Sequence, residues 1–210
     1  IASPKDAFSH GIGMVHQHFK LVECFSVMDN IILGNEDTSM GFIQKKKARE
    51  KVKKLSDTYG LHVDLDAKVS DITVGMQQRT EILKMLYRDN DILIFDEPTA
   101  VLTPQEIEEL MQIMRNLKNE SKSILFISHK LNEIMAISDR CTILRKGKYI
   151  GTVNIKDTNK EELSSMMVGR DVKFAVDKTP AKPGKTVLKV QDLVVKSKLH
   201  KKNAVDGVSI

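Results

Sequence analysis

Two adjacent carboxylates follow an apolar run in the middle of the chain. Residues 92–95 (ILIF) are all apolar, and Asp96, Glu97 and Pro98 come directly after them. Such a run is typical of a buried strand whose end would hold both carboxylates. Asp96 could then bind Mg²⁺, directly or through water, while Glu97 could orient or deprotonate a water that attacks a terminal phosphate. Taken alone, the same residues are equally consistent with a strand that simply turns.

A glycine turn and a histidine could complete such a phosphate site. Residues 74–79 (VGMQQR) open a helical pattern, and the free N–H groups at a helix N-terminus suit an anion. His129 follows a second apolar run, so that its imidazole could reach the same phosphate and Glu97. Each feature is weak in isolation, because glycine turns and structural histidines are common. The remaining histidines are interpreted as structural: His10, His16, His18, His62 and His200.

The elements that must position these residues alternate along the chain. The pattern predicts a strand within 11–19, helices over 27–34, 45–59 and 75–88, a strand ending at Asp96, a helix from 104 to about 118, a strand over 123–128 and a helix over 130–138. Strands that alternate with helices indicate an α/β fold with parallel strands and helical crossovers. Functional residues are expected at the carboxyl ends of such strands, and Gln17, Asp96, Glu97 and His129 all fall there.

Local signals set the ends of several elements. Thr103, Pro104 and Glu106 form a typical helix start, and Gly60 should close the helix over 45–59. The continuous apolar run that ends at Asp96 predicts a strand covered on both faces. Residues 141–145 and 148–153 indicate a hairpin that completes a domain. After a Lys-, Pro- and Ala-rich stretch over 174–185, expected to be a linker, strands are predicted at 187–195 and 204–210.

Charge and composition argue against a nucleic-acid partner and against a membrane-spanning segment. The net charge of +5 sits in the tail, because residues 173–202 carry +7 and leave the rest at −2. With 5% aromatic residues, none interleaved with the lysines, nucleic acid is not an expected partner. The longest apolar runs are four residues, far short of the roughly 20 needed to span a bilayer, and no secretory segment is expected at the start. Cys24 and Cys141 are expected to be reduced and half-buried.

In this order the motifs resemble those of ABC ATPases: Gln17 resembles the Q-loop, VGMQQR the signature, ILIFDEP the Walker B motif, TAVLTP the D-loop and ISH the H-loop. The signature is most similar to that of the subfamily that energises import of simple sugars and nucleosides. The resemblance covers roughly residues 1–172. It implies an incomplete RecA-like P-loop NTPase core with an ABC helical subdomain at about 38–88, a linker at 173–186 and, at 187–210, the first strands of a second cassette.

The resemblance also implies roles. Glu97, His129 and Gln17 would serve hydrolysis, Asp96 and Gln17 would serve Mg²⁺, and the signature would close over ATP held by the opposite cassette: Thr73, Val74, Gly75, Met76 and Gln77. Thr103 stands where the family often has Asp, which puts one of the two composite sites in doubt. Permease subunits, a second cassette in the same polypeptide and, indirectly, a solute-binding lipoprotein or periplasmic protein would be the partners, at the cytoplasmic face of the membrane.

A phosphate-cradling loop, G-x-x-x-x-G-K-[ST], does not occur in the 210 residues. Gly184-Lys185-Thr186 is a decoy, because Thr179 stands where the first glycine is required and a strand is expected after it. The resemblance places the real loop before the position of Ile1, so these residues alone are expected to bind ATP poorly and not to hydrolyse it. A soluble ABC ATPase of DNA repair or translation, and a non-enzymatic scaffold, remain as alternatives. Neither coiled-coil heptads nor a basic face between Gln17 and Gly75 supports the first alternative.

Overall fold

The structure is a computed structural model that describes residues 1–170, 180, 184–197 and 202–210. It divides into two compact units, Ile1–Val172 and Lys173–Ile210. In chain order the first contains α1 (Pro4–Ser9), β1 (Ile12–Val15), α2 (Val27–Ile32), β2 (Thr38–Ser39), β3 (Phe42–Ile43), α3 (Lys45–Tyr59), the 3₁₀ turn η1 (Val69–Asp71), α4 (Val74–Tyr87), β4 (Ile92–Asp96), α5 (Pro104–Asn119), β5 (Ser123–Ile127), α6 (Leu131–Ile137), β6 (Arg140–Arg145), β7 (Lys148–Asn154), η2 (Ile155–Asp157) and α7 (Lys160–Val168). The second contains β8 (Leu193–Lys196) and β9 (Asn203–Val208).

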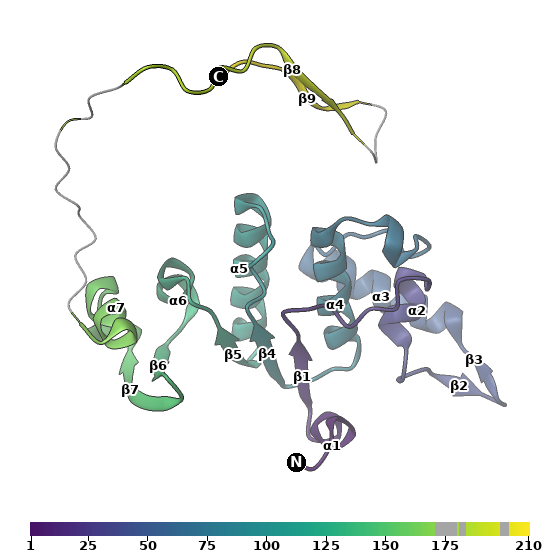
Figure 1. The fold of residues 1–210 in the computed structure, drawn as a ribbon. Coiled ribbons are helices and arrows are strands. Elements are labelled where there is room, and N and C mark those ends of the chain that lie inside the picture. The colour runs from purple at the N-terminus through teal and green to yellow at the C-terminus, as the bar shows by residue number, and fades with distance from the viewer. Residues whose placement is uncertain (171–179, 181–183, 198–201) are drawn as a thin grey trace. The chain divides into compact units, whose positions relative to one another are not determined.

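A parallel sheet lies at the centre of the first unit (Figure 1). Its strand order is β1-β4-β5, with β4 in the middle and both pairings parallel. Phe95 is in register with Val15 on one side and Phe126 on the other, so the three carboxyl ends reach the same edge. The predicted α/β fold with a parallel sheet is confirmed, and the edge that was expected to hold the functional residues is formed by these three strand ends.

Among the described residues only one face of the sheet is well buried, so the prediction that the strand ending at Asp96 is covered on both faces is wrong: Ile92 of this strand is 41% exposed. Leu93 and Phe95 are fully buried, whereas Leu125 is 56% exposed and Ile127 44%. The side chains of a strand alternate between faces, and only the face that carries Leu93 and Phe95 receives helices. A continuous apolar run shows that both faces avoid water but does not show which elements cover them.

Local capping signals set the helix ends as expected. Thr103 and Glu106 form a complete capping box at the start of α5, with Pro104 at the first helical position. Gly60 ends α3 in the left-handed region at φ 68°. The buried side of α5 is an apolar stripe at helical spacing, and it packs into the core beneath the sheet: Leu110, Met111, Ile113, Met114 and Leu117.

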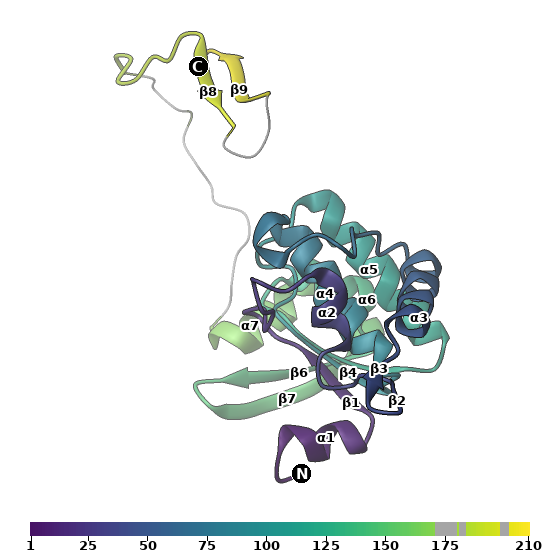
Figure 2. The same cartoon turned by 90° about the vertical axis from the view of Figure 1, so that its right-hand side faces the viewer.

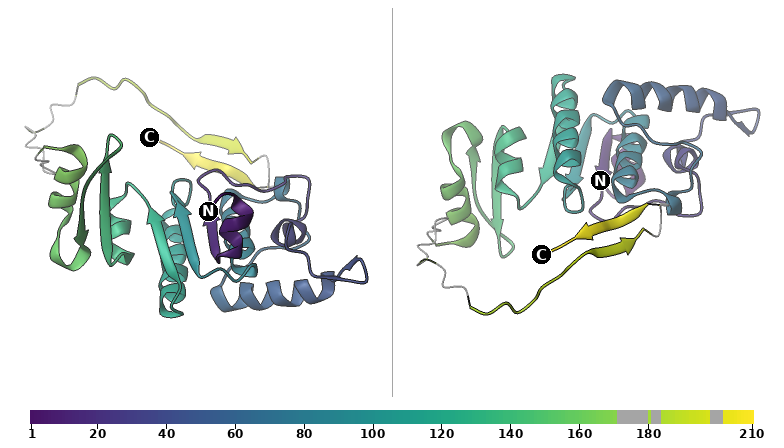
Figure 3. Two further views of the ribbon diagram at one scale, coloured as in Figure 1. Left: turned by 90° about the horizontal axis from the view of Figure 1, so that it is seen from below. Right: turned by 90° about the horizontal axis from the view of Figure 1, so that it is seen from above.

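Helices α2, α3 and α4 lie beside β1, on the side of the sheet away from β6 and β7 (Figures 1 and 3). Helix α4 contacts both α2 and α3. These three helices share one hydrophobic core with the sheet. Phe95 of β4 is fully buried in that core together with residues of the helices: Val27, Ile31, Val52 and Leu83. Figure 2 shows α1 next to the beginning of β1, with which it is in contact.

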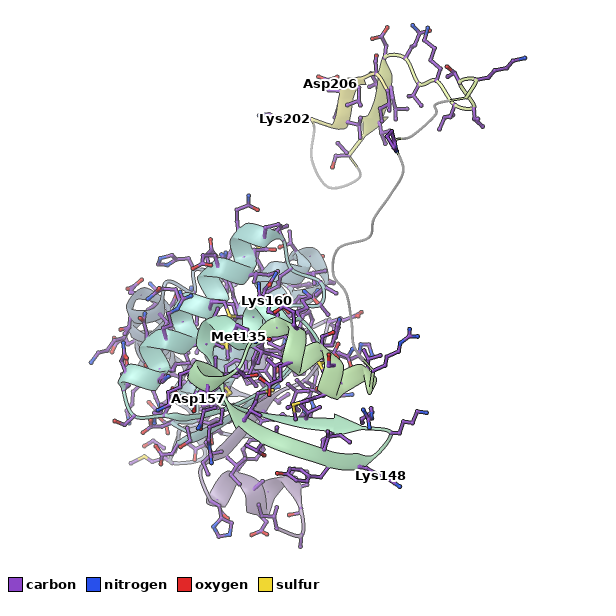
Figure 4. The ribbon with its side chains drawn as sticks, turned by 90° about the vertical axis from the view of Figure 1, so that its left-hand side faces the viewer. Met135, Lys148, Asp157, Lys160, Lys202 and Asp206 are labelled. Atoms are coloured by element: carbon purple, nitrogen blue, oxygen red, sulfur yellow. The ribbon has the colours of Figure 1, made fainter. Side chains whose placement is uncertain are left out.

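The hairpin β6–β7 and helix α7 follow the sheet in the chain. The strands pair antiparallel, as predicted, and α7 contacts both β6 and α6. Figure 4 shows Lys148 at the outer end of this hairpin, with Met135 marking α6 and Lys160 the start of α7. The structure therefore has a small α/β layer after the parallel sheet.

The second unit is an antiparallel hairpin of β8 and β9. Strand β8 begins at Leu193, later than the predicted start at Val187, because Val187 is 99% exposed and pairs with no strand. Val190 and Ile210 still exchange two backbone hydrogen bonds. Of the predicted linker, residues 173–179 and 181–183 lie outside the described residues.

The two cysteines differ in their exposure to solvent. Cys24 is exposed, contrary to expectation, because it lies in the loop before α2, whereas Cys141 is half-buried. In the part of the chain that the structure describes, no helix has both the length and the apolar character needed to cross a bilayer.

Candidate functional site

Glu97 lies between two of the predicted site residues. The Nε2 of Gln17 donates to one carboxylate oxygen of Glu97 at 3.4 Å, and the Nδ1 of His129 lies 3.1 Å from the other. These residues come from three different strand ends, those of β1, β4 and β5, and the parallel register brings them together. A carboxylate between an amide and an imidazole, 28% exposed, is accessible to a water and suited to accept a proton from it.

The backbone of Glu97 has an unusual conformation. Its φ is 44°, in the left-handed region that residues other than glycine seldom adopt. The carbonyl of Ile127 accepts from the Glu97 N–H at 3.0 Å, which holds this turn against the end of β5. The turn that follows β4 therefore directs the side chain of Glu97 towards Gln17 and His129.

Asp96 is the last residue of β4 and is free to bind a cation. Within the described residues its carboxylate makes no hydrogen bond or ion pair. Mg²⁺ prefers oxygen ligands, and it usually takes few of them from the protein and the rest from water and phosphates. The described residues include no cluster of three or more metal-binding side chains. One free carboxylate, next in the chain to the Glu97 that Gln17 contacts, fits a metal that arrives with a nucleotide.

The signature residues stand at the N-terminus of α4. The hydroxyl of Thr73 caps the helix by accepting from the Met76 N–H at 3.3 Å, and Gln77 donates to the Val69 carbonyl. Val74 is 45% exposed and Met76 37%, which is unusual for apolar side chains at a helix start. In the described residues, no hydrogen bond or ion pair joins Thr73–Gln77 to Glu97 or its two neighbours. Among the described residues the signature therefore has no direct polar contact with the carboxylate site.

Gly75 of the signature lies against the start of α5. A Cβ atom at this position would overlap the carboxylate of Glu106, which also accepts from the N–H and the hydroxyl of Thr103 at 2.9 and 3.0 Å. The absence of a side chain at Gly75 thus lets the capping carboxylate of α5 approach the signature helix.

The sequence Gly184-Lys185-Thr186 is not a phosphate loop in the structure. All three residues are exposed, and the next element is β8 rather than a helix. A phosphate loop needs a helix N-terminus directly after its lysine.

Sequence reasoning missed a group of polar residues that contact one another next to Glu97 and His129 in the chain. Glu133 on α6 is 7% exposed and accepts hydrogen bonds from the hydroxyls of Thr99 and Ser128. Lys130 pairs with the same carboxylate. The sequence carries little signal for this group, since Thr99 and Glu133 are 34 positions apart and only a buried charge on a short helix would have drawn attention.

Comparison with known proteins agrees with the order of the motifs. A profile of the family described as "ABC transporter" matches residues 2–100. The nucleoside import ATP-binding protein NupA of Lactococcus lactis is 57% identical over 93% of this chain, and the guanosine import ATP-binding protein NupO of Bacillus subtilis is 59% identical over 93%. The chain belongs to the family of ABC transporter ATP-binding domains.

This ABC transporter domain spans about two fifths of the curated relatives, since its matches cover 39% and 38% of their lengths. A solved structure of an ATP-binding cassette of an ABC transporter, in its ADP conformation, is similar with a TM-score of 0.64 and 19% identity. That match covers 80% of this chain and 72% of the other. It shows the fold, a RecA-like P-loop core with the parallel sheet described above.

Proposed function

We propose that this ABC ATPase is part of the ATP-hydrolysing subunit of an importer of nucleosides. The observation that carries the proposal is the position of Glu97 between Gln17 and His129 at the carboxyl edge of a parallel sheet. That edge is where doubly wound α/β folds bind their ligands. A carboxylate so placed can take a proton from a water as the water attacks the γ-phosphate of ATP.

The chain's own residues divide the work of hydrolysis. Glu97 accepts the proton of the attacking water, and Gln17 and His129 hold the carboxylate in place through its two oxygens. His129, 63% exposed on its side chain, can also donate to the γ-phosphate. Asp96 and Gln17 would hold Mg²⁺, which neutralises charge on the phosphates. The aligned carboxyl ends of β1, β4 and β5 keep these groups within a few ångströms of each other.

The signature residues would act on a second nucleotide. Thr73–Gln77 make no hydrogen bond with Glu97 in the described residues. They stand at the N-terminus of α4, where Val74 and Met76 are exposed. This geometry supports closure of α4 over ATP held by an opposite cassette. That cassette would belong to the same polypeptide, with residues 187–210 as its first strands after a linker at 173–186.

The names of the two relatives support nucleosides as the solutes. Both are import proteins, one for nucleosides and one for guanosine, at 57% and 59% identity. Import implies permease subunits, a solute-binding lipoprotein or periplasmic protein, and a place at the cytoplasmic face of the membrane. It also favours transport over the alternatives in DNA repair or translation, for which these relatives give no support. Simple sugars are the competing solute class.

The test is uptake by the assembled importer in proteoliposomes with Mg-ATP inside. We expect uptake of radiolabelled guanosine and no uptake of ribose. Glu97→Gln should stop uptake and phosphate release while binding of a fluorescent ATP analogue persists, because the amide can hold position but cannot accept the proton. Glu50→Gln on α3 is the matched control, since this exposed carboxylate forms no hydrogen bond or ion pair within the described residues. Ribose uptake would overturn the solute class, and full turnover in Glu97→Gln would overturn the proposed base.

A further inference from the structure

Helix α6 carries a buried carboxylate that the proposed hydrolysis does not use. Glu133 is 7% exposed and lies in the first turn of α6, four positions after His129. A buried carboxylate is costly unless it is hydrogen-bonded and paired, because burial removes its water. The residues that contact the Glu133 carboxylate therefore indicate its role.

Both hydroxyl partners of Glu133 flank the hydrolysis residues. Thr99, 2% exposed, donates its hydroxyl to one Glu133 oxygen at 2.8 Å, and Ser128 donates to the same oxygen at 3.1 Å. Thr99 lies two positions after Glu97 in the chain, and Ser128 immediately precedes His129. One carboxylate oxygen thus connects the loop after β4 with the loop after β5.

Lys130 closes the group from the other side. Its ammonium lies 3.4 Å from the second oxygen of Glu133 and donates to the Thr99 carbonyl at 2.9 Å. The Lys130 N–H in turn donates to the Ser128 hydroxyl at 3.0 Å. Every member contacts at least two others, so that moving one loop relative to the other would break several hydrogen bonds at once. We call these four residues, Thr99, Ser128, Lys130 and Glu133, the α6 clamp.

We propose that Glu133 is a positioning residue, which through the α6 clamp fixes the separation of Glu97 and His129. The inference rests on the proposed function, because it assigns a role in the same hydrolysis site. The 3.1 Å contact between His129 and Glu97 is made by two side chains that are partly exposed, so the contact alone constrains the loops weakly. Thr99 and Glu133 of the clamp are buried, and the clamp joins the loops on both sides of that contact. Small displacements of reacting groups lower rates strongly.

The first experiment measures the clamp without reference to activity. Hydrogen exchange of the 210-residue chain is followed by mass spectrometry for the wild type and for Glu133→Ala. We expect faster exchange in residues 98–102 as well as in residues 128–134, although the two segments are far apart in sequence. Glu50→Gln should change neither segment. Faster exchange confined to α6 would overturn the clamp.

The second experiment measures turnover in the assembled importer. Glu133→Ala should lower kcat for ATP by about tenfold to a hundredfold and change KM less than about twofold, because positioning acts on the reacting groups and leaves nucleotide binding unchanged. Glu133→Gln should recover most of kcat, since its amide oxygen can accept both hydroxyls. An unchanged kcat per folded molecule in Glu133→Ala would show a role in stability alone and overturn the proposal.

A milder pair of variants guards against loss of folding. Thr99→Val removes one clamp hydroxyl at similar volume, and Thr99→Ser keeps it. We expect a reduced kcat in the first, of about threefold to tenfold, and near wild-type kcat in the second; equal kcat in both would count against the clamp. If Glu97→Gln leaves turnover intact, the proposed base fails. The exchange experiment still decides whether the clamp exists.

Discussion

The carboxylate of Glu106 lies against the Cα of Gly75, so that the start of α5 and the start of α4 meet where a side chain is missing. The same carboxylate completes the capping box of α5 with Thr103. Arg79 on α4 also pairs with Glu109 on α5, at 2.6 Å. The signature helix and the segment after the Walker B strand are therefore packed as one piece.

Gly75→Ala should destabilise the chain through this contact. The added methyl group would displace the flexible carboxylate of Glu106 and weaken the capping box, while alanine gains up to about 1 kcal/mol over glycine in helix propensity, so we expect a net cost of up to about 1 kcal/mol in the free energy of unfolding. Urea denaturation followed by circular dichroism measures it. Gly184→Ala is the control, because a Cβ atom there meets nothing within 4 Å, and it should change stability by less than about 0.5 kcal/mol.

A double-mutant cycle identifies Glu106 as the cause. Glu106→Ala alone should cost about 1 kcal/mol by loss of the cap. In that background Gly75→Ala should cost at least about 1 kcal/mol less than in the wild type, because the methyl group no longer meets the carboxylate. Additive effects would show that Gly75 is required for some other reason.

His129→Ala should slow hydrolysis in the assembled importer. The variant removes the group at 3.1 Å from Glu97 and the proposed donor to the γ-phosphate, and we expect kcat to fall by about a hundredfold or more. Phosphate release at saturating ATP measures it. His62→Ala provides the comparison, since His62 is 71% exposed on its side chain and lies outside the site. Wild-type kcat in His129→Ala would remove the imidazole from the mechanism.

Stability should depend on pH through Asp29 at the start of α2. Hydrogen bonds from Lys45 and then Ser26 lower the pKa of this carboxyl below its ordinary value. Its contribution is therefore fully present above the ordinary carboxyl pKa, near pH 4, and is lost as pH falls through the lowered value. The side chain is 37% exposed, so we expect only on the order of 0.5 kcal/mol.

Urea denaturation between pH 2.5 and 7 checks this. Asp29→Asn should be less stable than the wild type at pH 6, and the difference should shrink below pH 4. Glu50→Gln should show no such convergence. A difference between Asp29→Asn and the wild type that persists at pH 2.5 would mean that the side chain acts by shape rather than by charge.

The two cysteines should differ in reactivity. Cys24 is exposed, whereas Cys141 on β6 is half-buried and burial raises the pKa of its thiol. The thiolate is the nucleophile, so Cys141 should be alkylated more slowly at neutral pH. Iodoacetamide labelling of the folded chain, followed by peptide mass spectrometry, should show Cys24 modified first. Labelling in urea supplies the control, since both sites should then react at similar rates; faster labelling of Cys141 in the folded chain would contradict the structure.

Local sequence patterns were enough to predict the helices, the strands and the family resemblance. Helix ends such as Thr103 and Gly60 depend on hydrogen bonds and backbone angles within a few residues, so short patterns predict them. The alternation of strands and helices placed Gln17, Glu97 and His129 at one sheet edge, because parallel strands share a direction. The order of the motifs indicated an ABC ATPase, and the relatives confirm that family.

The contacts between side chains far apart in the sequence could be seen only in the folded structure. The contact of Glu106 with Gly75 and the α6 clamp around Glu133 join residues about 30 positions apart, through packing that no local pattern encodes. The exposed face that carries Leu125 and Ile127 was likewise not readable, because an apolar run does not say what lies against it. Long-range contacts depend on how the elements pack together, and burial then fixes the few polar groups that must find partners.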